Sequence, residues 1–193
     1  MQQLVFATNN RHKVEEVSAK IKGEIKILTL ADIGCYDDIA ETGLTFAENA
    51  SIKSHFINRN YKLNCFGDDS GLEIEALNNE PGIYSARYAG THGDHQANIE
   101  KVLKKLAGNP NRNARFRTVI SLIWHEKEYF FEGVIKGNIR TECTGVKGFG
   151  YDPIFEPEGY NITFAEMDLD EKNKISHRAK SVEKLISFIN TQS

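Results

Sequence analysis

The segment Gly67-Asp68-Asp69-Ser70-Gly71 constrains this chain more than any other, because it sets two adjacent carboxylates at the start of an apolar segment. In residues 72–77, apolar and acidic side chains alternate, which predicts a strand with one face on a core and the other toward water. The motif is therefore expected to form a turn that opens into a strand. Adjacent carboxylates at such a turn repel each other unless a cation or bound protons hold them together.

Two interpretations of this acidic pair stay open at this point. Mg²⁺ is the simplest cation for it, because this hard ion takes one or two protein carboxylates and leaves its other positions to water and substrate phosphates. In the alternative, Asp68 or Asp69 accepts hydrogen bonds from nearby backbone amides in an ordinary Asx-turn. Asp, Ser and Gly are all common in turns, so the motif alone does not choose between them.

Size and composition bound the class of protein. The chain has 193 residues, of which 40% are hydrophobic and 26% charged, with a net charge of -3, as in a globular protein of one domain with one or two lobes. The sequence has no long apolar run and no signal-peptide pattern, which predicts a cytoplasmic protein without a membrane partner. A slightly acidic chain has no general attraction to nucleic acid. Cys35, Cys65 and Cys143 are widely spaced, which favours reduced thiols over disulfides or a metal site.

A phosphate-binding turn is predicted near the N-terminus. An apolar strand over residues 4–7 is broken by Thr8-Asn9-Asn10, and a helix follows whose buried stripe is Val14, Val17 and Ile21. The free backbone amides at such a helix N-terminus suit a phosphate. Lys13 lies in the first turn, where the helix dipole disfavours it and a bound anion would offset that cost. The alternative is a solvated Lys13 behind an Asn N-cap.

A second helix is predicted after the polar loop Glu41-Thr42-Gly43, which itself follows a strand over residues 25–30. Thr45 and Glu48 form a capping-box pattern, and Phe46, Ala50 and Ile57 make an apolar stripe. Lys53 projects into the middle of this stripe. Its ammonium either snorkels past the core or meets an anion held in a cleft, and we favour the anion.

The middle of the chain predicts a third helix and a hairpin. Thr91 and Asp94 match a capping pattern ahead of the stripe Ile99, Val102, Leu103 and Leu106, which explains His92 and His95 without a metal, since no third ligand is nearby. The β-type segments 116–124 and 129–135 flank the charged turn 125–128 and predict an antiparallel hairpin.

The last third holds two further clusters. In the glycine-rich segment 145–153, Phe149 lies between two glycines, which would let a flat group such as a base stack on its ring; in the alternative it fills a gap in the core. Ser176 is a good N-cap for a final helix with Ala179, Val182, Ile186 and Ile189 facing inward. His177 and Arg178 fall in its first turn, so an anionic or acceptor-rich partner is expected.

Taken together, these segments resemble the inosine/xanthosine triphosphate pyrophosphatase family, whose members hydrolyse deaminated purine nucleotides. The resemblance runs in the family's order through Thr8–Lys13, Glu41–Gly43, Phe46 with Glu48–Ala50, Lys53, Asp68–Leu72, Pro81–Tyr88, Gly148–Pro153 and Ser176–Arg178. It covers nearly the whole chain. Departures are slight: Glu75 stands where the family often has Asp, and Val146-Lys147 lies in a loop where smaller residues are usual.

The resemblance implies a fold and a reaction. The expected fold is α/β, with an elongated mixed β-sheet flanked by helices and two lobes around a central nucleotide-binding cleft. Residues 1–193 would form a single nucleoside triphosphate pyrophosphatase domain, assembled as a homodimer. The expected reaction converts ITP, dITP or XTP and water into the monophosphate and pyrophosphate with Mg²⁺ as cofactor, and so cleanses the nucleotide pool.

The resemblance also assigns roles to residues. Asp69 is the expected general base for the attacking water, and Glu41, Asp68 and Asp69 form the expected metal site. The expected substrate-binding residues are Thr8, Asn9, Asn10, Arg11, His12, Lys13, Lys53, Ser70, Phe149, Gly150, Tyr151, Asp152, Lys172, Ser176, His177 and Arg178. The same groups make physical sense, because lysines and a metal neutralise the charge that develops on a pyrophosphate leaving group.

Two other functions stay open on sequence grounds. A pyrophosphatase of pyrimidine or modified nucleotides would share the triphosphate chemistry but would lack the Ser176-His177-Arg178 segment expected to clamp a purine. A non-catalytic nucleotide-binding module would keep the lysines and Phe149 but would not need Glu41, Asp68 and Asp69 together.

Overall fold

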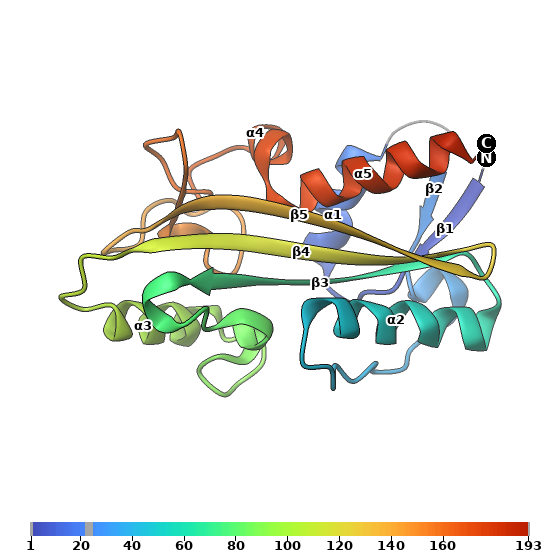
Figure 1. Ribbon diagram of the computed structural model, residues 1–193, viewed down its shortest axis with the longest axis horizontal. Helices are drawn as coiled ribbons and strands as arrows, with labels where there is room; N and C mark the ends of the chain where they lie inside the picture. Colours follow the sequence, from blue (N-terminus) through green and yellow to red (C-terminus); the bar gives the residue numbers. More distant parts are fainter. Residues whose placement is uncertain (1, 22–24, 193) are drawn as a thin grey trace. The chain divides into compact units, whose positions relative to one another are not determined.

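The computed structural model describes residues 2–21 and 25–192, which build an α/β fold on one six-stranded sheet (Figure 1). The strands are β1 Gln2–Phe6, β2 Ile25–Leu28, β3 Cys65–Ile74, β4 Asn113–Trp124, β5 Lys127–Ile139 and β6 Phe155–Pro157. Their order in the sheet is β2-β1-β3-β4-β5-β6; β1 is parallel to β2 and β3, and β5 is antiparallel to β6. The predicted mixed sheet flanked by helices is confirmed.

Four of the five helices in the described residues lie where the sequence periodicity places them, although their bounds differ in detail; the short helix over residues 169–175 was not predicted. They are α1 Arg11–Lys20, α2 Phe46–Tyr61, α3 His95–Lys105, α4 Leu169–Ile175 and α5 His177–Thr191. Within the described residues no helix combines the length and the apolar character needed to cross a bilayer. All three cysteines are free thiols, and Cys35 and Cys65 are buried.

The chain divides into two compact units. Unit 1 comprises residues 1–69, 118–133 and 178–193, and unit 2 comprises residues 70–117 and 134–177. Strands β3, β4 and β5 each contribute residues to both units. Each unit has its own hydrophobic core, so each positions its own set of functional side chains.

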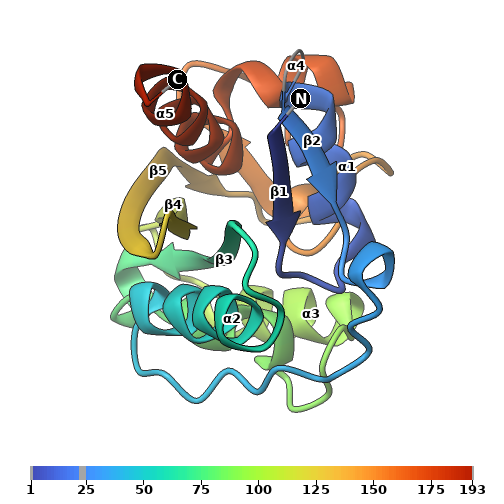
Figure 2. The same cartoon turned by 90° about the vertical axis from the view of Figure 1, so that its right-hand side faces the viewer.

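The core of unit 1 follows the two-residue period of its strands. Leu4 and Phe6 of β1 pack with Val17 of α1 and with Val182 and Leu185 of α5. The intervening residues Val5 and Ala7 pack with Ile57 of α2. Figures 1 and 2 show α1 and α5 on one side of these strands and α2 on the other. Successive side chains of a strand in unit 1 therefore meet different helices.

The core of unit 2 is a single cluster around aromatic rings. Phe116 of β4 packs against Phe155, at 4.6 Å between ring centroids, and against Phe164, at 6.0 Å. Ile99, Val102 and Leu106 of α3 belong to the same cluster, as the predicted stripe requires.

The acidic pair lies inside β3 rather than in a turn, which corrects the sequence prediction. Asp68 and Asp69 are in mid-strand, and residues 75–77, expected to continue the strand, form a 3₁₀ turn. The strand is buried on both faces: even Glu73 is buried, where its carboxylate accepts a hydrogen bond from Nε of Arg115 at 2.5 Å. A strand with neighbours on both sides and helices on its faces is not limited to one buried face.

The strand geometry separates the two carboxylates. Phe66 belongs to the cluster that α1 and α5 cover, whereas Cys65 belongs to the cluster that α2 covers. With a period of two residues, Asp68 faces the α1 and α5 side with Phe66, and Asp69 faces the α2 side with Cys65. The expected side-by-side repulsion is therefore relieved by the pleat of the strand.

The helix caps and the hairpin turn confirm most of the local signals. Asn10 caps α1 by accepting a hydrogen bond from the backbone N–H of Lys13 at 3.3 Å. Thr45 caps α2 in the same way, although Glu48 accepts from Leu44 N–H instead of closing the predicted box on Thr45. Asp94, not Thr91, is the N-cap of α3.

The predicted hairpin is formed by β4 and β5, which are neighbours in the sheet. Its turn is at His125 and Glu126, whose φ angles of 47° and 65° suit a two-residue hairpin turn.

Gly67 sets the distance between α2 and β3, and its substitution tests this. A Cβ on Gly67 would lie 2.5 Å from the backbone oxygen of Ala50 and 2.8 Å from Cβ of Lys53. We expect Gly67→Ala to lower the free energy of unfolding by about 1–3 kcal/mol, the usual cost of overpacking, and Gly67→Ser to lower it further. Chemical denaturation measures both. Wild-type stability in Gly67→Ala would show that α2 does not rest on the strand at this point.

Candidate active site

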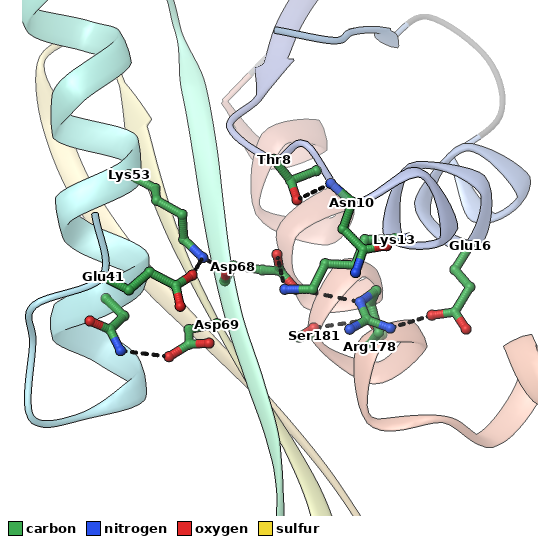
Figure 3. Close-up of polar contacts among 11 residues, drawn as sticks. Thr8, Asn10, Lys13, Glu16, Glu41, Lys53, Asp68, Asp69, Arg178 and Ser181 are labelled. Atoms are coloured by element: carbon green, nitrogen blue, oxygen red, sulfur yellow. Dashed lines mark hydrogen bonds and ion pairs between the residues drawn. The ribbon is translucent and has the colours of Figure 1, made fainter. Parts of the chain in front are cut away.

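Asp68 is the centre of a charge cluster in unit 1 (Figure 3). Its carboxylate is buried and accepts a hydrogen bond from Nζ of Lys13 on α1 at 2.8 Å. Nε of Arg178, at the start of α5, donates to its other oxygen at 3.4 Å. Both cations come from the side of the strand that Asp68 faces. The anionic partner that the sequence predicts for Lys13 and Arg178 is therefore present within the protein, as the carboxylate of Asp68.

Glu16 of α1 is a member of this cluster that the sequence analysis did not identify. It is buried, and its carboxylate accepts a hydrogen bond from Nη1 of the buried Arg178. Glu16 stands three residues after Lys13, so both lie on one face of α1. A signal did exist: a buried arginine needs buried counter-ions, and a carboxylate beside the apolar stripe of α1 is a candidate.

On the α2 side, Lys53 and Asp69 are held separately. The ammonium of Lys53, with a side chain only 8% exposed, donates to Oε1 of Glu41 at 2.5 Å and to the backbone oxygen of Asp68. The prediction that Lys53 meets an anion is confirmed. The buried carboxylate of Asp69 instead accepts a hydrogen bond from the side-chain amide of Asn49 at 2.9 Å.

These environments shift the pKa values of the two aspartates in opposite directions. Burial alone would raise the pKa of Asp68, but the charges of Lys13, Arg178 and Lys53 outweigh it and hold that pKa below its ordinary value. Burial raises the pKa of Asp69 to about 6, and the charges of Lys53 and Lys13 offset it only in part. Asp68 is therefore a firmly ionised anchor, and Asp69 is the more basic carboxylate.

The donor chemistry of this cluster fits Mg²⁺, although the carboxylates are not gathered as a ready-made metal site. Glu41, Asp68 and Asp69 supply only hard oxygen donors. Within residues 2–21 and 25–192, no three His, Cys, Asp or Glu side chains are grouped so that they could hold an ion. Glu41 is in contact with Lys53, and the two aspartates face opposite sides of β3. The set suits an ion that takes one or two carboxylates and completes its shell with phosphate and water.

In the predicted phosphate-binding turn, side chains of the turn accept hydrogen bonds from nearby backbone N–H groups. Thr8 Oγ1 accepts a hydrogen bond from the backbone N–H of Asn10 at 3.1 Å, which closes the turn ahead of α1. Asn9 is exposed. Arg11 and His12 lie on the outer surface of α1, where both pair with Glu15. The structure thus brings Lys13, but not Arg11 or His12, to the charge cluster.

Unit 2 holds a second arrangement of predicted residues. The buried carboxylate of Asp152 accepts hydrogen bonds from Nζ of Lys172 at 2.7 Å and from the backbone N–H of Phe149 at 2.8 Å. The same ammonium lies 5.0 Å from the centre of the Phe149 ring. Asp152 therefore fixes both the cation and the aromatic ring.

The glycines beside Phe149 also shape the local backbone. Gly148 and Gly150 have φ angles of 73° and 62°, which favour glycine. A Cβ on Gly148 would lie 2.1 Å from Oδ2 of Asp152. Gly148 therefore allows the backbone to pass close to the Asp152 carboxylate, whereas Gly150 is required only by its positive φ.

Three more predicted substrate-binding residues are buried within unit 2. Tyr151 donates its hydroxyl hydrogen to the backbone oxygen of Ser85 at 2.9 Å. The ring of His177 stacks on Phe116 with centroids 4.7 Å apart, and Ser176, just before α5, is fully buried. Ser70 is partly exposed on β3. The structure therefore brings Phe149, Asp152 and Lys172 together in unit 2, and Arg178, expected with them, belongs to the cluster of unit 1.

Comparison with known proteins gives a consistent result. The model of the Ham1 family matches residues 4–188. The chain is 50% identical to the dITP/XTP pyrophosphatase of Flavobacterium psychrophilum, over 96% of this chain and 98% of the relative. It is also 50% identical to the dITP/XTP pyrophosphatase of Porphyromonas gingivalis, over 98% of each chain. The solved Staphylococcus aureus Ham1 protein superposes with a TM-score of 0.90 at 37% identity over the full length of both chains.

Two Asp–Lys pairs of unit 2 allow a matched test of burial. Removing Asp152 leaves the buried ammonium of Lys172 without its carboxylate, so we expect Asp152→Ala to lower the free energy of unfolding by about 3–5 kcal/mol. Asp168 pairs with Lys147 at the exposed surface, where solvent screens the pair, so Asp168→Ala should leave the denaturation midpoint unchanged. Equal effects of the two substitutions would contradict the role given to Asp152.

Proposed function

Because the chain belongs to the Ham1 family, we propose that it hydrolyses non-canonical purine nucleoside triphosphates such as ITP, dITP and XTP to the monophosphate and pyrophosphate. This is a nucleoside triphosphate pyrophosphohydrolase reaction that removes deaminated nucleotides from the pool. One observation of the structure carries the proposal: Lys13 and Arg178 of unit 1 both contact the buried carboxylate of Asp68 in the middle of β3, and Lys53 contacts its backbone oxygen, next to the buried carboxylate of Asp69.

Lys13 and Lys53 would bind the outer phosphates. In the structure their ammonium groups contact the carboxylates of Asp68 and Glu41. A triphosphate offers several charged oxygens, so we propose that the lysines exchange carboxylate partners for phosphate partners when the nucleotide binds. They would then neutralise the charge that develops on the pyrophosphate leaving group.

Glu41, Asp68 and Asp69 are the proposed donors for Mg²⁺. When bound, the ion would polarise the phosphoryl centre and neutralise phosphate charge. The exchange of lysine partners would make oxygens of Glu41 and Asp68 available, which links cofactor binding to substrate binding.

Asp69 is the proposed general base. It lies on the side of β3 opposite the Lys13 and Arg178 contacts of Asp68, and burial makes it the more basic of the two carboxylates. A base is more effective when its pKa lies near the operating pH. Asp69 would accept the proton of the attacking water, while Asp68 would stay ionised and hold the cations in place.

Unit 2 would recognise the purine. We propose that the base stacks on Phe149, whose backbone and neighbouring cation are fixed by Asp152. The ammonium of Lys172 can only donate hydrogen bonds, which suits the carbonyl oxygens of hypoxanthine and xanthine. A cytoplasmic homodimer, implied by the family resemblance, completes the proposal.

A panel of nucleotides tests the proposed reaction. With Mg²⁺ and phosphatase-free enzyme, ITP, dITP and XTP should be converted faster than ATP, GTP, CTP and UTP, and the products should be monophosphate and pyrophosphate. Asp69→Asn should keep nucleotide binding but lose at least about a hundredfold in kcat. Orthophosphate with a diphosphate would refute the assigned bond, preference for pyrimidines would refute the substrate class, and wild-type turnover in Asp69→Asn would refute the base.

Arg178 belongs to the segment expected to clamp a purine, and we propose that it donates a hydrogen bond to the 6-carbonyl of the base. It donates through Nε and Nη1 to Asp68 and Glu16, and its guanidinium has five N–H donors in all. If it also serves the base, Arg178→Ala should lower kcat/KM for ITP more than for ATP, since adenine has an amino donor at position 6. Lys13→Ala is the control, because loss of a phosphate contact should lower kcat/KM for ITP and for ATP by the same factor. An equal loss in Arg178→Ala would restrict Arg178 to the charge cluster.

A further inference from the structure

Asn49 of α2 is a fully buried amide with both ends of its side chain in use. Its Nδ2 donates to Oδ2 of Asp69 at 2.9 Å, and its Oδ1 accepts from the backbone N–H of Gly43 at 2.8 Å. One side chain thus joins β3 to the loop that carries Glu41. All of these residues belong to unit 1.

The contact with Gly43 determines which end of the amide meets Asp69. A backbone N–H can only donate, so the side-chain oxygen of Asn49 must point to Gly43, and the NH₂ group is then directed at the carboxylate. This orientation follows from the hydrogen-bond network itself. An amide donor is the right partner for an ionised carboxylate, which only accepts.

The loop packs closely enough to make this contact specific. A Cβ on Gly43 would lie 2.8 Å from Oδ1 of Asn49 and 2.6 Å from Cβ of Glu48. Glu41 stands two residues earlier, and Lys53 of the same helix α2 contacts its carboxylate. Helix α2 therefore holds this loop at two points, through Asn49 and through Lys53.

We propose that Asn49 is a positioning residue for the hydrolytic reaction: it fixes the rotation of the Asp69 carboxylate and ties the Glu41 loop to it. The inference rests on the proposed function, in which Asp69 is the general base. A base must keep its oxygen within hydrogen-bond reach of the attacking water. Misplacement by about 1 Å can cost about a hundredfold in rate.

Two substitutions separate the two hydrogen bonds. Asn49→Ala removes both. Asn49→Asp keeps an acceptor for the Gly43 N–H but faces Asp69 with an oxygen instead of a donor. Both variants should lower kcat for ITP by about 10- to 100-fold, as loss of a supporting partner of a reactive group does, with KM within about threefold of wild type. A change in KM without a change in kcat, or an unchanged kcat in both variants, would overturn the proposal.

Asn98 of α3 provides a matched control. It is equally buried and also bridges a loop, with Oδ1 accepting from the backbone N–H of Ala89 at 2.6 Å and Nδ2 donating to the backbone oxygen of Ala86 at 3.3 Å. Its amide contacts are to backbone, not to a carboxylate of the cluster. Asn98→Ala should lower the melting temperature as Asn49→Ala does but keep kcat. An equal kcat loss in both would mean that a general loss of packing explains the effect.

A double-mutant cycle tests whether Asn49 acts through Asp69. In an Asp69→Asn background, Asn49→Ala should cause no further loss of kcat, because the base that it positions is already absent. The same further factor in both backgrounds would show that Asn49 acts elsewhere and would overturn the proposal.

Melting temperatures give a readout that does not depend on turnover. For Asn49→Ala and Asp69→Ala, the shift of the double variant should differ from the sum of the single shifts by at least about 2 °C, because the two side chains share a buried hydrogen bond. Additive shifts would overturn the proposal whatever the enzyme hydrolyses. A wild-type protein inactive on every triphosphate, with non-additive shifts, would refute the proposed function and with it the catalytic role of Asn49.

Discussion

The buried carboxylate of Asp68 is the constraint on which the arrangement of unit 1 depends. A charge withdrawn from water is tolerated only when cations and hydrogen bonds replace its hydration. Lys13 and Arg178 provide these, and they come from α1 and α5, at opposite ends of the sequence. Both helices must therefore pack on the same side of the strands, and the shared apolar cluster around Phe6 and Phe66 brings them there. Arg178 also contacts Glu16, a second buried anion, so the buried arginine has two carboxylates to balance its own charge.

The pleat of β3 places the neighbouring side chains of Asp68 and Asp69 in different environments. Asp68 faces the helices that bring cations, and its pKa is held low, whereas Asp69 faces α2, and burial raises its pKa to about 6. Lys13, Lys53 and Arg178 each contact a carboxylate from the set Asp68, Glu41 and Glu16. Asp69 is the fourth carboxylate, and it is held by the amide of Asn49. Environments that move two carboxyl groups apart in pKa are how one site obtains both a fixed charge and a base.

The sequence predicted what depends on near neighbours and missed what depends on distant ones. The caps at Asn10 and Thr45 and the hairpin turn after Trp124 are local, and they were predicted within a few residues. The long family motifs predicted the fold and the reaction class. Gly67 and its acidic neighbours were predicted as a turn because their composition is turn-like, but the glycine serves the approach of α2 to a central strand. The pair of Glu16 and Arg178 joins residues 162 positions apart, which no local pattern encodes.

Units 1 and 2 each contain an internal ion pair at a lysine that is expected to bind substrate. In each, a buried lysine that the proposed reaction would use is already paired with a carboxylate: Lys53 with Glu41, and Lys172 with Asp152. Binding by such a lysine is an exchange of partners, so the ligand must compete with a carboxylate that is already in place. A triphosphate with several charged oxygens can do so, whereas a ligand with one weak acceptor cannot recover the energy of the broken pair. In the proposed reaction, these internal ion pairs therefore disfavour the binding of weakly charged ligands. This selection by charge does not depend on recognition of the base.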